Sequence, residues 1–385
     1  MAQADVHRTG SRPSLPYGDE TLWPLRTLQF VAIAWVVLNQ FRFHLGLHAG
    51  DRFGLVFKGY LGAELFFVAG GFIACHAWMR MRAQGGRYTS LLWRRLARVY
   101  PLHLATMVAI AALALASRET HEPYAHSMID LAAVPANLAL VQAWGVLPTV
   151  SWNFPSWLIS AEWFALVAFP LTVTVAFRGW RGPWTAALAP IPLFAAAYYL
   201  AQNRGVLFSD MTAQIGALQT IPAFLFGAGL YRFAAERGLS RRAAGRMAVA
   251  SAVWIVAASV LRLPDPLIFP AFGALVLGLA ETLRSGRPWL AGPLARYLAS
   301  LAYAMLLVYL LVDIVFFHAV KAVLGEPHGA AAWLALAAVF PLILAAAAAA
   351  HHLIERPAYR RLRALDPVGE LLAFAKPGSA APTRS

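Results

Sequence analysis

The chain has 385 residues, of which 60% are hydrophobic and 13% charged, and its formal net charge is +14. A soluble domain needs far more polar surface, so this composition excludes a soluble globular protein and indicates a polytopic membrane protein. The positive charge does not indicate a nucleic-acid partner, because the sequence offers no basic soluble domain to bind one. Anionic membrane lipids are the simpler partner for these cations.

Ten apolar runs follow one another along the chain. Each has roughly the 17–23 residues that an α-helix needs to cross the hydrocarbon core. No alternation of apolar and polar residues indicates barrel strands, and helices satisfy their backbone groups internally. The sequence therefore predicts an all-α, polytopic membrane helix bundle with about ten transmembrane helices. The runs are 22–41, 60–79, 101–117, 156–177, 183–201, 213–231, 245–261, 266–283, 297–317 and 331–353.

The segment 129–146, between the third and fourth runs, is apolar but interrupted by Asp130, Pro135, Asn137 and Gln142. Buried polar groups and a proline both disfavour a full span. We therefore expect one short or re-entrant helix here.

Composition divides the chain into three parts. Residues 1–21 form a flexible polar N-terminus, 22–360 a transmembrane domain, and 361–385 a flexible cytoplasmic tail rich in Ala, Pro and Ser. The first apolar run is long and followed by others, so we expect a span and not a cleaved signal peptide.

Arginines gather in alternate gaps between the runs. Because Lys and Arg of short loops stay on the cytoplasmic side, we expect these gaps and both termini to be cytoplasmic, in a bacterial inner membrane. With ten spans all of these gaps fall on one side, which is a further reason to expect that 129–146 does not cross. The arginine-rich gaps are 80–98, 232–246, 284–296 and 356–363.

Metal binding is not expected. Cys75 is the only cysteine, which excludes an intramolecular disulfide and a cysteine-based metal site. His48, His76 and His103 lie near membrane faces without the spacing of metal ligands.

Glu64, Glu162 and Asp313 lie inside apolar runs, where charged side chains are costly and often functional. Glu162 follows Trp157 and Ser160, in a stretch dense in hydrogen-bonding groups. It suits a general acid or base, and equally a structural carboxylate that holds an arginine. Glu64 and Asp313 suit either a functional role or an interhelical hydrogen bond.

A cluster of Arg94, Arg95 and Arg98 precedes Tyr100 at the start of the third run. Residues three or four apart share a helix face, and the guanidinium fork matches phosphate geometry. The cluster could hold a phosphorylated cofactor, or it could anchor the helix end at the cytoplasmic surface.

Six stretches together resemble the acyltransferase-3 family of integral membrane proteins, over about residues 22–360. They occur in the order of the family's motifs, with matching runs between them. The stretches are 62–73 (GAELFFVAGGFI), 94–101 (RRLARVYP), 155–162 (PSWLISAE), 221–227 (IPAFLFG), 300–304 (SLAYA) and 354–357 (IERP).

This resemblance implies an O-acyltransferase that takes an acyl group, usually acetyl, from acyl-CoA on the cytoplasmic side. The acceptor would be a hydroxyl of a cell-envelope polysaccharide or lipid-linked sugar. The arginine stretch, Arg94, Arg95 and Arg98 with Tyr100, would meet the coenzyme A phosphates. Glu162 would act in the cavity, and we expect Glu64, Trp157 and Ser160 to line the substrate site.

The chain departs from the family pattern at four positions. The alignment places Gln29 and Gln40 at the arginine and histidine of the first span, Leu158 at a serine and Tyr309 at a histidine. An amide cannot act as a general base near neutral pH.

His44 could supply the missing base. Gln40 and His44 are i, i+4 neighbours, and Arg26 and His44 share a face if the helix continues that far. The alternative is that Arg26, Arg42 and His44 anchor the helix at the interface.

Two other functions stay open. A relative without turnover could serve as a scaffold or regulatory subunit beside glycan synthesis or export proteins. A transporter could move an acyl or glycan unit, which paired broken helices would support.

Overall fold

The computed structural model describes residues 16–18, 20–45, 53–119, 129–149, 151–203, 216–286, 288–325 and 327–365. The expected tails, 1–21 and 361–385, lie mostly outside these residues. Within them all regular structure is helical, which confirms the all-α membrane bundle. The long helices are α1 (Trp23–Gln40), α3 (Gly62–Ala83), α4 (Tyr88–Glu119), α7 (Trp157–Val167), α10 (Pro190–Asn203), α11 (Gly216–Glu236), α12 (Arg241–Val260), α13 (Asp265–Arg284), α14 (Pro293–Leu324) and α15 (Ala330–Ala350).

Shorter helical elements connect and extend these. They are α2 (Gly54–Phe57), η1 (Lys58–Leu61), η2 (Leu131–Ala133), α6 (Val134–Leu138), η3 (Phe154–Ser156), α8 (Phe169–Thr174), η4 (Val175–Gly179), α9 (Pro183–Leu188), η6 (His351–Glu355) and α16 (Arg356–Leu362).

Each of the ten apolar runs corresponds to a helix or a pair of helices. Seven segments of the described chain are long and apolar enough to cross a membrane, and the bent pair α7–α8 brings the number to eight. The remaining two expected spans, α1 and α11, are not among these candidates. Both carry many buried residues, so they lie inside the bundle and need less apolar surface toward lipid.

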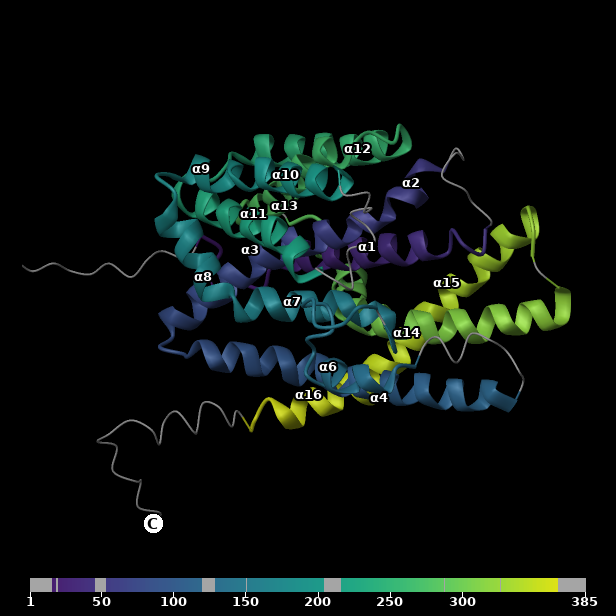
Figure 1. Cartoon of the computed structure of the whole chain (residues 1–385). Helices are drawn as coiled ribbons and strands as arrows, with labels where there is room; N and C mark the ends of the chain where they lie inside the picture. Colours follow the sequence, from purple (N-terminus) through teal and green to yellow (C-terminus); the bar gives the residue numbers. More distant parts are fainter. Residues whose placement is uncertain are drawn as a thin grey trace, which may run out of the picture.

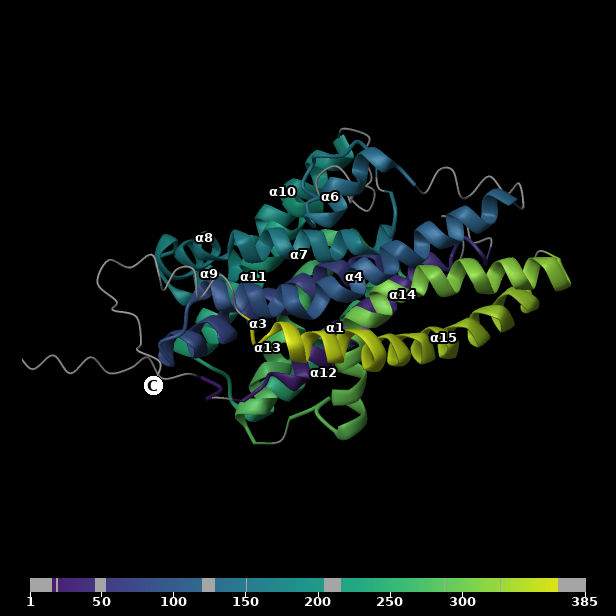
Figure 2. The same ribbon diagram turned by 90° about the horizontal axis from the view of Figure 1, so that it is seen from below.

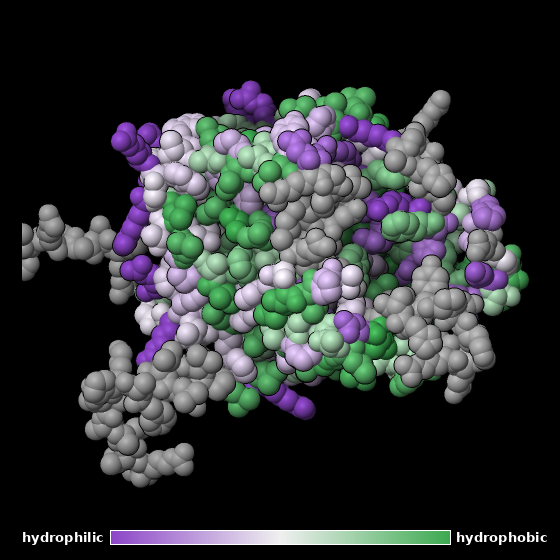
Figure 3. Space-filling model, viewed as in Figure 1, coloured by the Kyte–Doolittle hydropathy of each residue, from purple (hydrophilic) through white to green (hydrophobic). Residues whose placement is uncertain are grey.

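Most of the long helices lie side by side along one direction, whereas α15 crosses this view obliquely (Figure 1). The turn between α3 and α4 lies at the left end of that view, α16 lies at the bottom below α6, and the connection from α14 to α15 lies at the right end. Figure 2 shows the same arrangement from below. In Figure 3 hydrophilic residues stand out along the left edge, and apolar residues cover much of the middle of this face.

Helices α3 and α11 approach so closely that glycine is required at the contact. A Cβ added at Gly71 would collide with the carbonyl oxygen of Phe224, and one at Gly227 with the carbonyl oxygen of Val68. Small residues let membrane helices pack backbone against backbone. The glycines of two family-like stretches therefore have a packing role.

The fourth span is broken. Helices α7 and α8 meet at an angle of 57° at Ala168. Pro170 is in the first turn of α8, where proline cannot continue the preceding helix but suits a new one.

The segment 129–149 forms a short helix and turns, as expected, and not a span. Polar bonds tie its buried residues to α4 and η3, while other residues of the segment are exposed. His103 Nε2 lies 2.9 Å from the carbonyl oxygen of Asn137, and Gln142 donates to the Ser156 hydroxyl at 2.9 Å. Non-helical backbone is tolerated at membrane depth only where protein buries it.

Candidate functional site

Two of the three clustered arginines point into the bundle, toward Tyr303 of α14. The guanidinium carbons of Arg95 and Arg98 lie 4.3 and 5.4 Å from the centre of that ring. The two arginines are three positions apart on α4 and so share a face. Arg94 is exposed and does not join them. The predicted phosphate cluster is therefore divided between two faces of the helix.

Arg95 is held by Glu162 and Tyr303. Its Nη2 donates to the Glu162 carboxylate and to the Tyr303 hydroxyl. That hydroxyl lies 3.2 Å from each oxygen of Glu162, and both side chains are almost fully buried. Here Glu162 acts as a carboxylate that holds an arginine, one of the two roles expected of it.

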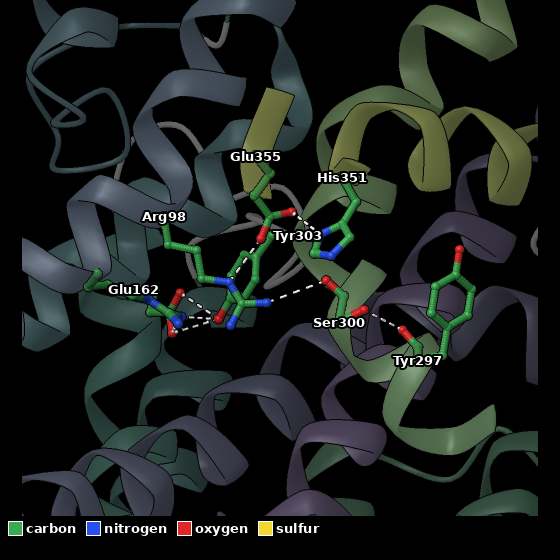
Figure 4. A network of polar contacts seen from close by, with 8 residues as sticks. Arg98, Glu162, Tyr297, Ser300, Tyr303, His351 and Glu355 are labelled. Atoms are coloured by element: carbon green, nitrogen blue, oxygen red, sulfur yellow. Dashed lines mark hydrogen bonds and ion pairs between the residues drawn. The ribbon is translucent and has the colours of Figure 1, made fainter. Parts of the chain in front are cut away.

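Arg98 continues the network toward the end of α15. Its Nε donates to Oε1 of Glu355 at 2.9 Å, and the other oxygen of Glu355 lies 3.0 Å from Nδ1 of His351. Figure 4 shows Arg98 between Glu355 and Tyr303. The turn of π-helix η6 spans His351 to Glu355, and such turns often occur at functional sites.

One cation beside this network is unpaired. Nε of Arg26, on α1, is buried and has no hydrogen-bond partner among the described residues. Arg80, Arg95 and Arg98 are close enough to interact with it electrostatically, and all three repel it. The Arg26 side chain is half-buried and lies 6.0 Å from the centre of the Trp23 ring, and an anion would compensate its charge among these like charges. The cluster can therefore bind an anion such as a phosphate.

The Ser160 hydroxyl binds the backbone of the turn at residues 140–143, next to the network. It donates to the carbonyl oxygen of Leu140 at 2.8 Å and accepts from the amide of Ala143 at 3.1 Å. Leu140 has a φ of 56°, a left-handed conformation that a residue with a Cβ adopts at a cost. Leu140 covers a cavity of about 10 Å³ beside Arg95 and Glu162, which has room for roughly one water.

A second polar pair lies further along α14. Nε2 of His44 is 2.8 Å from Oδ1 of Asp313, with their side chains 33% and 20% exposed. The imidazole also stacks on the Phe317 ring, with centroids 3.6 Å apart and planes at 2°. Histidine, an aromatic support and a carboxylate are a suitable arrangement for a general base.

The first helix does not continue from Arg26 to His44, so the condition for a shared face is not met. Helix α1 ends at Gln40, and residues 41–45 form turns. Asn39 donates to the carbonyl oxygens of Val56 and Phe57, both at 2.9 Å, so the end of α1 is tied to the returning chain. His44 reaches Asp313 from this turn and not from the face that Arg26 shares.

The four departures from the family pattern lie at separate places. Gln29 is buried and its amide lies 3.4 Å from the carbonyl oxygen of Phe66, a long hydrogen bond. Gln40 is half-buried at the end of α1, and Leu158 is buried in α7. Tyr309 is buried in α14, on the stretch between Tyr303 and Asp313.

Three other predicted site residues do not join the network. Glu64 is fully buried and accepts from Gln219 at 2.5 Å. The Tyr100 hydroxyl donates to the carbonyl oxygen of Leu138 at 3.0 Å, which ties α4 to α6. Trp157 is buried against Phe67, with ring centroids 6.4 Å apart.

The described residues contain no group of three or more metal-ligating side chains. Sequence reasoning gave no individual role to Tyr303, Glu355 or His351. It left Asp313 open between a functional role and an interhelical hydrogen bond, and Arg26 open between a partner of His44 and an interfacial anchor. Tyr303 and Glu355 belong to two of the family-like stretches, so their presence in motifs was the available signal.

Comparisons with known proteins identify the family of the chain. The model of a family described as an acyltransferase domain, acyltransferase-3, matches residues 25–352. Acyltransferase MdmB of Streptomyces mycarofaciens is 34% identical over 116 residues, which is 29% of this chain and 28% of the relative. The alignment thus spans less than a third of that protein. No solved structure matches the chain.

Proposed function

The chain belongs to the acyltransferase-3 family, and from this premise we propose that it transfers an acyl group from acyl-CoA to a hydroxyl of a cell-envelope polysaccharide or lipid-linked sugar. One observation carries the proposal. Four family-like stretches, which contain Arg95, Glu162, Tyr303 and Glu355, meet in one buried network beside an unpaired cation.

Arg26 is the residue that we assign to the donor. Arg95 and Arg98 are already paired with Glu162 and Glu355, so the charge available for a phosphate comes from Arg26. Arginine binds phosphate oxygens through paired donors, and a partly dry site strengthens the attraction. The ion pairs of Arg95 and Arg98 would fix the position of the phosphate site, and the Arg26 guanidinium would bind the phosphate.

His44 is the residue that we assign to the acceptor. Nε2 of His44 faces Oδ1 of Asp313 at an ion-pair distance of 2.8 Å, although without hydrogen-bond geometry, and with the ring proton on Nε2 the other nitrogen, Nδ1, would accept the proton of a hydroxyl. The hydroxyl oxygen would then attack the thioester carbon, the carbon–sulfur bond would break, and the thiolate would leave as coenzyme A. The acceptor proton would pass from His44 to solvent or to the leaving thiolate.

The two clusters lie on the same helix. Tyr303 and Asp313 are both in α14, and at 1.5 Å per residue their backbones are about 15 Å apart along its axis. A donor with its phosphates at Arg26 would need an extended arm of about this length to bring its thioester to His44. We place the arginine-rich end in the cytoplasm of a bacterial inner membrane, with both termini on that side.

Binding of acetyl-CoA to the detergent-purified protein tests the donor site. Arg26→Gln should abolish binding, because it removes the unpaired cation, and should keep or raise the melting temperature, because it relieves an unfavourable buried charge. The matched control is Arg94→Gln, which removes an exposed arginine from the same end. Unchanged binding in folded Arg26→Gln protein would exclude this assignment.

A relative without turnover is the second candidate, favoured by Gln29 and Gln40 at the family's arginine and histidine positions. It would act as a scaffold or regulatory subunit beside glycan synthesis or export proteins. Failure of the folded wild-type protein to bind acetyl-CoA at millimolar concentration would favour this function and rule out the enzyme.

A further inference from the structure

A groove of about 780 Å³ opens on α12, away from the network described above. Helix α12 is a candidate span of which only 33% of the apolar window is buried in the protein, so most of its surface is left to face lipid. The groove is lined by Arg241, Arg242, Gly245, Arg246, Val249, Ala250 and Trp289.

The arginines of the groove are arranged on two neighbouring rows of α12. Arg241, Gly245 and Val249 follow one another at i, i+4 spacing, as do Arg242, Arg246 and Ala250. The three arginines are exposed, and none of the seven described lining residues is acidic. Their charges therefore converge on one opening without a counter-ion from the lining.

Two of these arginines occupy an unfavourable position in the helix. Arg241 and Arg242 are in the first turn of α12, which holds no acidic residue, and cations there oppose the helix dipole. An anion in the groove would compensate both the dipole and the mutual repulsion of the arginines. The helix thus favours a negatively charged ligand at this point.

Trp289 forms the wall of the groove. Its indole packs over Gly245, so that a Cβ at Gly245 would lie 3.4 Å from the ring. Its backbone amide lies 3.3 Å from Oγ1 of Thr282, a long hydrogen bond that orients the loop before α14. The ring is 44% exposed, and exposed tryptophans of membrane proteins prefer the level of the lipid headgroups.

An apolar stripe continues from the groove along α12. Val249, Val253, Val256 and Val260 are about half exposed or more, and their spacing places them on one side of the helix. The arginines of the groove suit the charged headgroup of a phospholipid, and the valine stripe next to it suits an acyl chain.

We propose that this groove binds an anionic phospholipid, with its phosphate between Arg241, Arg242 and Arg246. The headgroup rests against Trp289 and one acyl chain follows the valine stripe. This site is independent of acyl transfer, since it shares no residue with the donor or acceptor clusters.

Native mass spectrometry of the full-length protein in detergent tests the site. The probes are dioleoyl phosphatidylglycerol, dioleoyl phosphatidylcholine and sn-glycerol 3-phosphate. We expect one phosphatidylglycerol retained per chain, phosphatidylcholine bound at least tenfold more weakly, and no competition by glycerol phosphate. Equal retention of both lipids, or displacement by glycerol phosphate, would overturn the lipid assignment.

Two variants locate the binding. Replacing Arg241, Arg242 and Arg246 by glutamine should weaken phosphatidylglycerol binding roughly 100-fold, at about fivefold per arginine. The matched control replaces Arg360, Arg361 and Arg363, three exposed arginines in and beside α16, with the same change in charge and no expected effect. An equal loss in both triple variants would mean unspecific attraction and would overturn the proposal.

Gly245→Leu keeps every charge and fills the groove beside Trp289. It should lower phosphatidylglycerol retention about tenfold, because the leucine side chain would take the space in which the lipid contacts the groove. Wild-type retention in this variant, measured on protein with an unchanged melting temperature, would show that the lipid binds elsewhere.

Discussion

Helix α14 carries two polar clusters of opposite character. At Tyr303 the charges of Arg95, Glu162 and Glu355 are largely buried and each is paired. At Asp313 one histidine meets one carboxylate, and both side chains are partly exposed. The first cluster joins four segments of the chain, whereas the second joins only α14 and the turn after α1. The buried and paired cluster around Tyr303 holds the helices in place, and we call it the framework. The partly exposed pair at Asp313 can exchange its contact for one with a substrate.

Of these changes, Glu162→Ala should lower the free energy of unfolding the most. It leaves the Arg95 guanidinium without its carboxylate in a mostly buried place, at a cost of about 3 kcal/mol or more in the free energy of unfolding. Thermal unfolding in detergent measures this. The double variant Glu162→Ala with Arg95→Met should recover part of the loss, because no buried charge remains. A wild-type melting temperature for Glu162→Ala would show that the pair does not stabilise the bundle.

His44→Ala should separate activity from stability at the other cluster. Loss of a general base lowers the transfer rate by about 10²-fold or more, whereas removing a half-exposed side chain costs about 1 kcal/mol at most. Transfer of a labelled acetyl group to isolated envelope lipids and glycans measures the rate. His352→Ala, a histidine at the arginine-rich end, is the control and should keep the wild-type rate. Equal rates in all three proteins would exclude His44 as the base.

Asp313→Asn should have a smaller effect, since the asparagine still fills the place beside His44. We expect transfer to fall about tenfold, because the asparagine keeps the shape of the side chain but removes the negative charge beside the imidazole. The labelled-acetyl transfer assay measures this loss. A wild-type rate in folded Asp313→Asn protein would exclude a role for the carboxylate.

Arg94→Gln should have the smallest effect of all. This arginine is exposed and lies outside the framework, so the free energy of unfolding should change by less than about 0.5 kcal/mol. Acetyl-CoA binding should stay within about twofold of wild type, at a surface contribution of less than about 0.5 kcal/mol. A large loss of binding would place the donor phosphates at the surface and not beside Arg26.

Much of the fold could be predicted from the sequence, because lipid imposes a minimum length on every span. The ten apolar runs and the interruption at 129–146 each correspond to an observed feature. The first apolar run, 22–41, ends within one residue of the observed end of α1 at Gln40. The bond from Asn39 to the carbonyl oxygen of Val56 could not be predicted, because it joins the end of α1 to a segment further along the chain.

The site was only partly predictable, because its contacts join segments that are far apart in the sequence. The positions of Arg95, Arg98 and Glu162 followed from motifs, but their mutual pairing depends on how α4, α7 and α14 pack. That pairing leaves Nε of Arg26 without a hydrogen-bond partner among the residues that the structure describes, which no local pattern indicates. Likewise, the contact between His44 and Asp313 joins two segments far apart in the sequence.

The π-helical turn at the end of α15 accommodates one residue more than an α-helical turn would. Loss of a single residue between His351 and Glu355 would restore regular winding, and because the extra residue is absorbed within the turn, α16 would keep its direction. The spacing of His351 and Glu355 would fall from four residues to three, and their contact, 3.0 Å between Nδ1 and the carboxylate, would change. Such a deletion should therefore alter the polar network at this end of the bundle while the arrangement of the helices stays the same.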